Sequence, residues 1–267
     1  MSNISHLPNQ RRAAILEALA RGEAVSAAKL AADYSVSEDA IRRDLRKLAA
    51  EGLCEKVYGG ALPVAPSAQP VSVRTAEDVD RKEALVKAAV SLIRPRDCLF
   101  LDVGSTNIIL AEHLPLNLEL TVVTNSIPVV AKLMGRKGLH LFSLGGAVNA
   151  EVGGTTGSQT ISALQNFQFD LTFLGTCGLC RQNGVSAYDA EDADVKRAAI
   201  RASDRVTILA TKEKLDTRLP HRILAFDGID SLVLEEQVSE ECRLEYKTET
   251  NRIVVAAPPA ARRTLVR

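Results

Sequence analysis

The sequence predicts two domains: a small α+β winged helix-turn-helix, followed by an α/β domain with a doubly wound, mostly parallel sheet. Helix-period segments and one glycine hairpin fill the first part of the chain. Short apolar runs then alternate with helical stretches, which is typical of a parallel sheet. The segment Leu62–Thr75 separates the two parts, because its prolines should keep it from forming helix. We therefore expect domains at 1–62 and 80–267, with a linker at 63–79.

The composition indicates an ordinary globular protein. Of its 267 residues, 46% are hydrophobic and 25% charged, which excludes a disordered or fibrous chain. Aromatic residues make up only 4% and Trp is absent, so the core must be built from aliphatic side chains. The formal net charge of +0 argues against a generally basic coat for nucleic acid, but it leaves room for a local basic patch.

Neither export nor a membrane span is predicted. Apolar runs such as Leu120–Val123 are far too short to cross a bilayer. The stretch Met1–Arg12 lacks the apolar region of a secretory signal. We therefore expect a cytoplasmic protein without a membrane partner, whose five cysteines are reduced thiols rather than a disulfide framework.

The first domain is expected to contain three helices and a hairpin. Apolar spacing and capping residues place the helices at Asn9–Arg21, at Ala27–Tyr34 behind an N-cap Ser26, and from an N-cap Ser37 to about Glu51, where Gly52 stops it. The following Leu53–Leu62 alternates enough to form two short strands around Gly59 and Gly60.

The third helix carries a basic face. Ile41, Leu45 and Leu48 stack on one side. The opposite side holds Arg42, Arg43, Arg46 and Lys47, with Asp44 at the edge of this arc and Asp39 near its start. A charged helix face is often merely solvated, but four cations repel one another unless an anion meets them. Two helices and a tight turn before this helix, and a hairpin after it, favour insertion into the major groove of double-stranded DNA.

The predicted DNA contacts extend from the second helix to the hairpin. Lys56 and Tyr58 would follow the DNA backbone, and Gly59 and Gly60 permit close approach, although a bare turn would also use them. The predicted DNA-binding residues are Ser26, Lys29, Ser37, Ala40, Arg42, Arg43, Arg46, Lys47, Lys56, Tyr58, Gly59 and Gly60.

Seven apolar runs of the second part are expected as strands: Cys98–Val103, Leu120–Val123, Leu139–Leu144, Leu171–Leu174, Val206–Ala210, Ile223–Phe226 and Ser231–Leu234. Helical stretches separate several of them: Arg81–Ile93, Ser126–Met134 and Ala190–Ala202. In doubly wound sheets, ligands bind at the carboxyl ends of the strands. The tail after Arg252 would suit one last strand and a frayed end, and the sequence does not predict its role.

The strand Cys98–Val103 leads into a turn of small polar residues, which are Gly104, Ser105, Thr106 and Asn107, before a helix from Ile108 to about His113. Backbone N–H groups and hydroxyls at a helix N-terminus favour a bound anion. A plain turn in which Ser105 or Thr106 caps the helix is the alternative. Asp102 would repel a phosphate, so it is better suited to sugar hydroxyls or to orienting the loop.

Further strand ends carry residues suited to a ligand crevice, namely Thr124, Asn125, Gly145, Gly146, Gly175 and Gly178. Asp192 and Lys196 share one face of their predicted helix, and Lys214 follows the strand Val206–Ala210. Acid–base pairs four residues apart are mostly weak helix stabilisers, so the pair alone does not indicate a site.

These motifs resemble the DeoR family of bacterial transcriptional regulators. VSEDAIRRDLRKLAAEGL and KVYGGAL, within Arg11–Leu62, resemble its DNA-binding domain. DVGSTN, TNS, LGG, FLGTCG and DADVKRA follow the order of its sensor domain over Asp80–Leu234. The chain departs from the family at Ala40, usually Thr, and at Lys56, usually Arg. Ala40 could contact a thymine methyl instead, and Lys56 gives up bidentate geometry.

The resemblance implies a sensor similar in fold to ribose-5-phosphate isomerase, in a family that typically responds to phosphorylated sugars. It implies that Asp102–Asn107, Thr124–Asn125, Lys196 and Lys214 line the effector pocket. Departures occur at Thr211, where Asp is usual, at Asp192, where Glu is usual, and at Ala199, where Met is common. The preferred effector therefore does not transfer from the family.

Two alternatives remain open. Cys177 and Cys180 form a C-x-x-C pair that would suit redox control, although small-residue packing explains it and no further zinc ligands accompany it. Isomerase chemistry would need a carboxylate base, for which Asp102 and Asp192 are available. An isomerase has no use for a DNA-binding domain, so binding without turnover is the better interpretation.

The sequence thus predicts a repressor of a carbohydrate-metabolism operon, controlled by a small phosphorylated sugar or sugar derivative. We expect no cofactor, no metal and no catalytic residues. A pseudo-symmetric operator requires two DNA-binding heads, so we expect a homo-oligomer, either a dimer or a tetramer.

Overall fold

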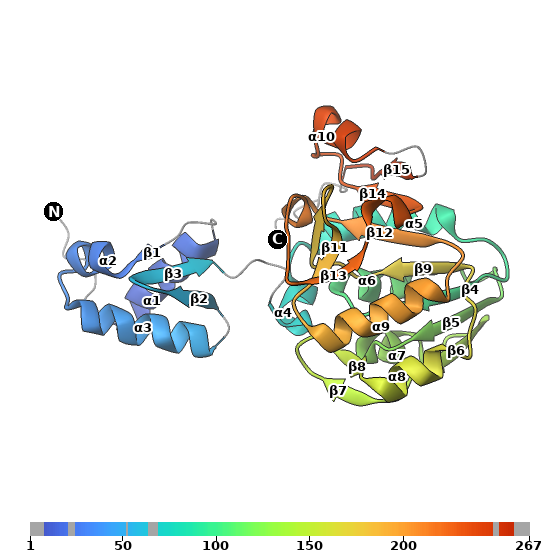
Figure 1. The fold of residues 1–267 in the computed structure, drawn as a ribbon, viewed down its shortest axis with the longest axis horizontal. Coiled ribbons are helices and arrows are strands. Elements are labelled where there is room, and N and C mark those ends of the chain that lie inside the picture. Colours follow the sequence, from blue (N-terminus) through green and yellow to red (C-terminus); the bar gives the residue numbers. More distant parts are fainter. Residues whose placement is uncertain (1–7, 21–24, 52, 64–68, 248–250, 259–267) are drawn as a thin grey trace, which may run out of the picture. The chain divides into compact units, whose positions relative to one another are not determined.

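The chain forms two compact units, residues 1–69 and 70–267, which are described separately below. The structure, a computed structural model, describes residues 8–20, 25–51, 53–63, 69–247 and 251–258. Figure 1 labels the helices and strands of both units. The predicted classes of both domains are confirmed: a helical unit with a small antiparallel sheet, and an α/β unit with a parallel one.

The first unit has the predicted order of three helices and a hairpin. Its helices are α1 (Pro8–Ala20), α2 (Ala27–Asp33) and α3 (Glu38–Ala50). Its antiparallel sheet has the order β1 (Val25–Ser26), β3 (Gly60–Pro63) and β2 (Cys54–Val57). Strand β1 was not predicted, because two residues are too few to show a period. The predicted stop at Gly52 lies outside the described residues.

The predicted helix caps are confirmed. The Ser26 hydroxyl accepts a hydrogen bond from the Lys29 N–H at 3.5 Å, and the Ser37 hydroxyl accepts one from the Ala40 N–H at 3.3 Å. The hairpin turn lies at Tyr58 and Gly59, since Gly60 already pairs within β3. A Cβ at Gly60 would lie 2.0 Å from the Val25 carbonyl oxygen, so the contact between β1 and β3 requires glycine there.

A buried ion pair joins α1 to α3. Arg11 Nε donates to Asp44 Oδ2 at 2.7 Å, and the two residues are only 4% and 9% exposed. The expectation that Asp44 borders the solvated basic arc is therefore wrong. Its carboxylate turns toward α1, and the outward face of α3 keeps its cations.

The second unit is built on a seven-stranded parallel sheet. The strand order is β15 (Arg252–Val255), β14 (Ser231–Leu234), β12 (Val206–Ala210), β9 (Leu171–Leu174), β4 (Cys98–Leu101), β5 (Leu120–Thr124) and β6 (Leu139–Ser143). The predicted strands are confirmed apart from small shifts at their ends and the run at Ile223. The tail supplies one last strand, β15.

Helices cover both faces of this sheet, as doubly wound topology requires. One core layer joins α5 (Val79–Ala89), α6 (Ser105–His113) and α7 (Ile127–Leu133) to strand residues such as Leu99 and Leu101. The opposite layer joins α8 (Ser158–Leu164) and α9 (Ala190–Arg201) to Phe100 and Val123. Neighbouring residues of one strand thus point to opposite layers, and both are buried.

Smaller elements surround the sheet. A second, antiparallel sheet contains β10 (Gly178–Cys180), β11 (Gly184–Ala187) and β13 (His221–Leu224). The run Ile223–Phe226, predicted as a strand of the parallel sheet, is only partly a strand: Ile223 and Leu224 end β13 in this antiparallel sheet, and Phe226 begins a 3-10 helix. A hairpin of β7 (Ala147–Asn149) and β8 (Gly154–Thr156), the 3-10 helices η2 (Val90–Leu92), η3 (Lys212–Lys214) and η4 (Phe226–Gly228), and α10 (Glu240–Glu245) complete the unit.

Two predicted loops are helical. The expectation of no helix in Leu62–Thr75 is wrong at its end, where α4 (Val71–Ala76) begins directly after Pro70. Pro70 occupies the N-cap, outside the positions where proline would break a helical hydrogen bond. The polar turn after β4 is shorter than predicted as well, because α6 starts at Ser105 and Gly104 is its N-cap.

The direction of chain winding reverses between β4 and β9. The chain passes from β4 to β5 and β6 on one side, then returns to β9 and continues through β12 to β14 and β15 on the other. A parallel sheet leaves an open crevice beyond the carboxyl ends of the strands at such a reversal. The segments that follow β4 and β9 therefore frame the candidate site.

Within the described part of the chain, none of the helices has both the length and the apolar character that crossing a membrane requires.

We expect Asp44→Ala to destabilise the first unit by about 3–5 kcal/mol, because it leaves the Arg11 guanidinium buried without its carboxylate. Hydrogen exchange at the α3 amides of the full-length protein measures this loss. The double variant Arg11→Met, Asp44→Leu should recover most of it, since an apolar pair needs no charge compensation. Equal exchange in Asp44→Ala and the parent protein would contradict the role of the pair.

Candidate functional site

A small pocket lies at the reversal point of the parallel sheet, with a cavity volume of about 30 Å³. It is framed by the start of α6, by the segment after β9, by α9 and by η3. Eight predicted ligand residues line it: Gly104, Ser105, Thr106, Asn107, Gly175, Asp192, Lys196 and Lys214. The structure adds seven lining residues that were not predicted: Arg74, Val103, Val152, Leu174, Thr176, Cys177 and Leu209.

The two segments at the reversal point touch through backbone. A Cβ at Gly175 would lie 2.0 Å from the Val103 carbonyl oxygen, so only glycine permits this approach. The Gly175 N–H donates to Asp102 Oδ2 at 2.8 Å. Asn107 fastens the same junction, because its side-chain amide donates to the carbonyl oxygens of Asp102 and Phe173 at 3.0 and 2.9 Å.

A buried ion triad lies at the base of the pocket. Lys196 Nζ lies 2.8 Å from Asp102 Oδ2 and 2.6 Å from Asp192 Oδ1. All three residues are at most 3% exposed. The predicted pair on α9 therefore does more than stabilise its helix, since it reaches across to the end of β4.

The triad also sets the protonation of its members. Burial raises the pKa of Asp102, while Lys196 and the Gly175 N–H oppose the rise. Burial alone would lower the pKa of Lys196, but the two carboxylates raise it above its ordinary value. Lys196 therefore stays charged. Asp102 Oδ1 is buried and has no hydrogen-bond partner among the described residues, which leaves one acceptor atom for a donor from a ligand.

The N-terminus of α6 opens into the pocket. Its N-cap is Gly104, which has no side chain to accept hydrogen bonds from the first-turn N–H groups. Thr106 is 5% exposed, and its hydroxyl lacks a hydrogen-bond partner in the part of the chain that the structure describes. N–H groups, the helix dipole and this hydroxyl together suit an anion.

Two further cations face the pocket from separate elements. Lys214 comes from η3, and Arg74 comes from α4. The pKa of Lys214 is lowered to about 8, mainly by burial and secondly by the positive charge of Arg74. An anion between these cations would offset both effects, because it favours the protonated form of the lysine.

Six of the predicted ligand residues do not line this pocket: Asp102, which is fully buried in the ion triad, and the five that follow. The Thr124 hydroxyl donates to the Leu101 carbonyl at 2.5 Å, and the Asn125 amide donates to the Thr155 carbonyl at 3.0 Å. Gly145 is exposed beyond β6, Gly146 packs against Thr160, and Gly178 begins β10. These residues hold neighbouring segments in place, and contact between them and a ligand remains a prediction.

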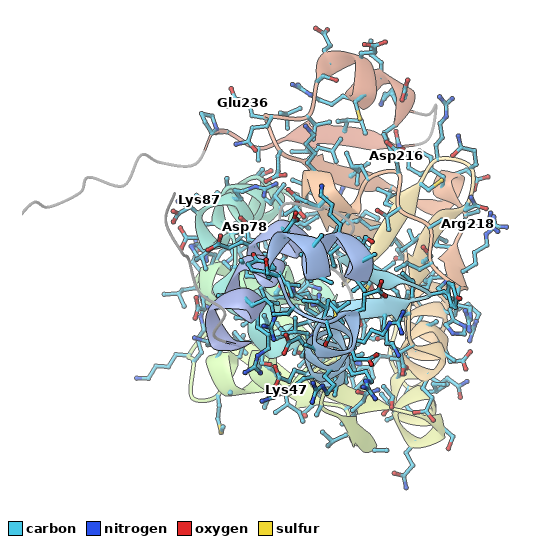
Figure 2. The ribbon with its side chains drawn as sticks, turned by 90° about the vertical axis from the view of Figure 1, so that its left-hand side faces the viewer. Lys47, Asp78, Lys87, Asp216, Arg218 and Glu236 are labelled. Carbon is cyan, nitrogen blue, oxygen red and sulfur yellow. The ribbon has the colours of Figure 1, made fainter. Side chains whose placement is uncertain are left out.

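The basic face of α3 lies outward, as predicted. Arg42, Arg43, Arg46 and Lys47 are exposed, and Figure 2 labels Lys47 near the end of the helix. Arg42 forms an exposed ion pair with Glu38 at 2.8 Å, which water screens and which an incoming phosphate can exchange. Ser26 and Ser37 act as helix caps, Lys29 is exposed, and Ala40 is half-buried.

The hairpin and α3 enclose a groove within the first unit. Arg42, Lys56, Tyr58, Gly59 and Gly60 are among its lining residues. Tyr58 lies fully exposed at the turn, beside Gly59 with φ +84°. The structure thus brings the predicted helix and hairpin residues to one surface.

The cysteines are free thiols. Cys177 lines the pocket, whereas Cys180 is buried in β10. Among the described residues, no three His, Cys, Asp or Glu side chains cluster as metal ligands.

Family models match both units. Residues 11–66 match the DeoR-like helix-turn-helix domain, and residues 77–236 match the DeoR C terminal sensor domain.

Full-length relatives resemble the chain as well. It is 30% identical to the putative aga operon transcriptional repressor of Escherichia coli O157:H7, over 86% of this chain and 87% of that protein. It is also 30% identical to the glycerol-3-phosphate regulon repressor of Escherichia coli K12, over 77% of this chain and 82% of that protein. Ribose 5-phosphate isomerase A from Methanocaldococcus jannaschii superposes with a TM-score of 0.39 and 14% identity, over 52% of this chain and 55% of that one. This last likeness says nothing about chemistry.

We expect sulfate to bind the pocket less tightly as the pH rises through about 8, because Lys214 then loses its proton. Sulfate keeps its charge over this range, so calorimetric titration at about pH 7 and about pH 9 isolates the protein group. The loss should be about tenfold.

Lys214→Arg should flatten this pH dependence, since a guanidinium stays protonated throughout. Lys87→Arg on the exposed surface of α5 is the matched control and should behave as the parent protein. A parent protein that binds sulfate equally at both pH values would exclude Lys214 from the anion site.

Proposed function

Because the chain belongs to the DeoR family of transcriptional regulators, we propose that it represses a carbohydrate-metabolism operon and that a phosphorylated sugar controls it. The observation that carries this proposal is the anion-suited pocket at the reversal point of the sheet. The chain joins this pocket to a unit with a basic helix and an adjoining hairpin groove.

The pocket residues support a ligand with two chemically different ends. The N-terminus of α6, the Thr106 hydroxyl and Lys214 suit a phosphate group. Asp192 and Lys196, two members of the triad, also line the pocket. A carboxylate oxygen accepts hydrogen bonds from sugar hydroxyls, and an ammonium group donates hydrogen bonds to them. Two relatives are named for the aga operon and for the glycerol-3-phosphate regulon, which favours a carbohydrate effector without selecting one.

The first unit supports binding to double-stranded operator DNA. Its third helix exposes Arg43, Arg46 and Lys47, and its hairpin exposes Lys56 and Tyr58. Arginines on such a helix read guanine edges or meet phosphates in the major groove. Two copies would match a pseudo-symmetric operator, so we propose a homo-oligomer. The effector controls DNA binding only if it binds the DNA-competent and DNA-incompetent states with different affinity.

An isomerase is the second candidate, favoured by the two buried carboxylates of the triad. A catalytic base must reach a substrate proton and accept it. Lys196 instead contacts one oxygen of Asp102 and one of Asp192, so both carboxyl groups are already engaged in a buried ion contact. We therefore propose binding without turnover.

Arg42→Ala and Arg43→Ala should each weaken binding to operator fragments selected from the source genome. If the arginine reads a base, the loss of binding free energy should be about 1–3 kcal/mol. If it contacts only phosphate, the slope of the logarithm of the binding constant against the logarithm of the salt concentration should be smaller by about 1. Fluorescence anisotropy over a range of salt concentrations separates the two cases. Arg96→Ala, an exposed cation of the second unit, is the control. Undiminished and equally salt-dependent binding by both helix variants would exclude the groove assignment.

Replacing both Ser105 and Thr106 with Leu should abolish the effector response and leave operator binding intact, since bulky side chains would fill the anion site. Thr106→Val is the gentler variant, because it removes only the hydroxyl and should weaken the response by about tenfold. Release of operator DNA by a panel of sugar phosphates measures both. A response of parental strength in the double variant would place the effector elsewhere.

A further inference from the structure

The helix α4 lies directly after the segment that joins the two units. It is six residues long, and helices this short depend on tertiary contacts for their stability. Its first residue, Val71, is 4% exposed and belongs to the core of the second unit. The position of α4 therefore determines where the connecting segment leaves the second unit.

Contacts at both ends attach α4 to the rest of this unit. The Val71 N–H donates to the Glu151 carbonyl at 2.9 Å, and the Val71 side chain fills the space that a Cβ on Gly153 would need. At the other end, Lys82 Nζ donates to the carbonyl oxygens of Glu77, at 2.6 Å, and of Arg74.

Consecutive residues of α5 connect the two cationic elements of the pocket. Lys82 contacts α4, as described above. Arg81 donates to Glu213 of η3 at 2.7 Å and to Glu235 at 2.7 Å. Glu213 directly precedes Lys214, so α5 holds both the helix that carries Arg74 and the turn that carries Lys214.

Arg74 is the pocket cation that comes from α4. Its side chain is partly buried and lines the pocket together with Ser105, Thr106 and Lys214. Burial lowers the pKa of Lys214 most, and the positive charge of Arg74 lowers it further, so the two cations repel each other. An anion bound between them turns this repulsion into two attractions, so its binding stabilises α4 in its place.

We propose that Arg74 binds the anionic group of the effector and thereby couples the pocket to the segment that leads to the DNA-binding unit. This inference rests on the proposed function, since it assigns Arg74 to the same anion site. The bound anion holds α4 against the sensor body, and the absence of the anion lets α4 loosen. The coupling acts through differential stability of one short helix.

Hydrogen exchange and calorimetry on the full-length protein test the proposal, with inorganic phosphate as the probe and chloride at equal ionic strength as the reference. In the parent protein, phosphate should slow exchange in the peptide that covers residues 70–78. Arg74→Gln should raise the dissociation constant for phosphate by about tenfold or more and abolish this protection. Arg96→Gln removes an exposed cation elsewhere on the unit and should match the parent protein.

Arg74→Lys provides a second variant in case glutamine disturbs α4 itself. It keeps the charge but not the fork geometry, so it should bind phosphate with intermediate affinity and retain part of the protection. Exchange without phosphate reports whether α4 still forms in each variant.

Parental phosphate affinity in Arg74→Gln would overturn the assignment of Arg74 while leaving the anion site in place. Phosphate binding without protection of residues 70–78 in the parent protein would overturn the coupling. If phosphate fails to bind the parent protein, or binds the Ser105→Leu, Thr106→Leu variant equally well, the anion site of the proposed function fails and this inference fails with it.

Discussion

The structure of the sensor unit depends on one buried contact, the ammonium of Lys196 between the carboxylates of Asp102 and Asp192. Burial makes each of these charges costly by itself, and their mutual contact offsets that cost. The triad joins the end of β4 to α9, and the Gly175 N–H adds the segment after β9 to the same carboxylate. These contacts therefore hold the end of β4, the segment after β9 and α9 together at the reversal point without a ligand.

Both units place acidic side chains where they leave cations directed outward. In the first unit, Asp44 turns inward to Arg11, so the outward arc of α3 presents Arg42, Arg43 and its other cations. In the second unit, Asp102 and Asp192 are neutralised by Lys196, while Arg74 and Lys214 face the pocket. The buried ion pairs thus determine which cations remain on the outward face of α3 and in the pocket.

The strands and the polar residues at their ends were predictable because parallel strands put their carboxyl ends on one edge of the sheet. The structure places Gly104–Asn107, which follow β4, and Gly175, which follows β9, around one pocket. Thr124 ends β5 and Gly145 follows β6 on the same edge, but neither lines the pocket: the Thr124 hydroxyl donates to the Leu101 carbonyl, and Gly145 is exposed. The order of the strands in the sheet decides which strand ends line the pocket, and a single sequence does not show this order.

The resemblance of the chain's sequence motifs identified the family, and local spacing predicted the two domain classes, the caps Ser26 and Ser37, and the basic face of α3. Only the tertiary structure decided the partners of Asp44 and Lys196 and the place of Arg74 in the pocket. Arg11 and Asp44 lie 33 residues apart, and the Arg74 side chain meets the pocket beside Lys214 from a segment that looked like linker. Such long-range contacts leave no periodic pattern in the local sequence, because they form only when packing brings distant elements together.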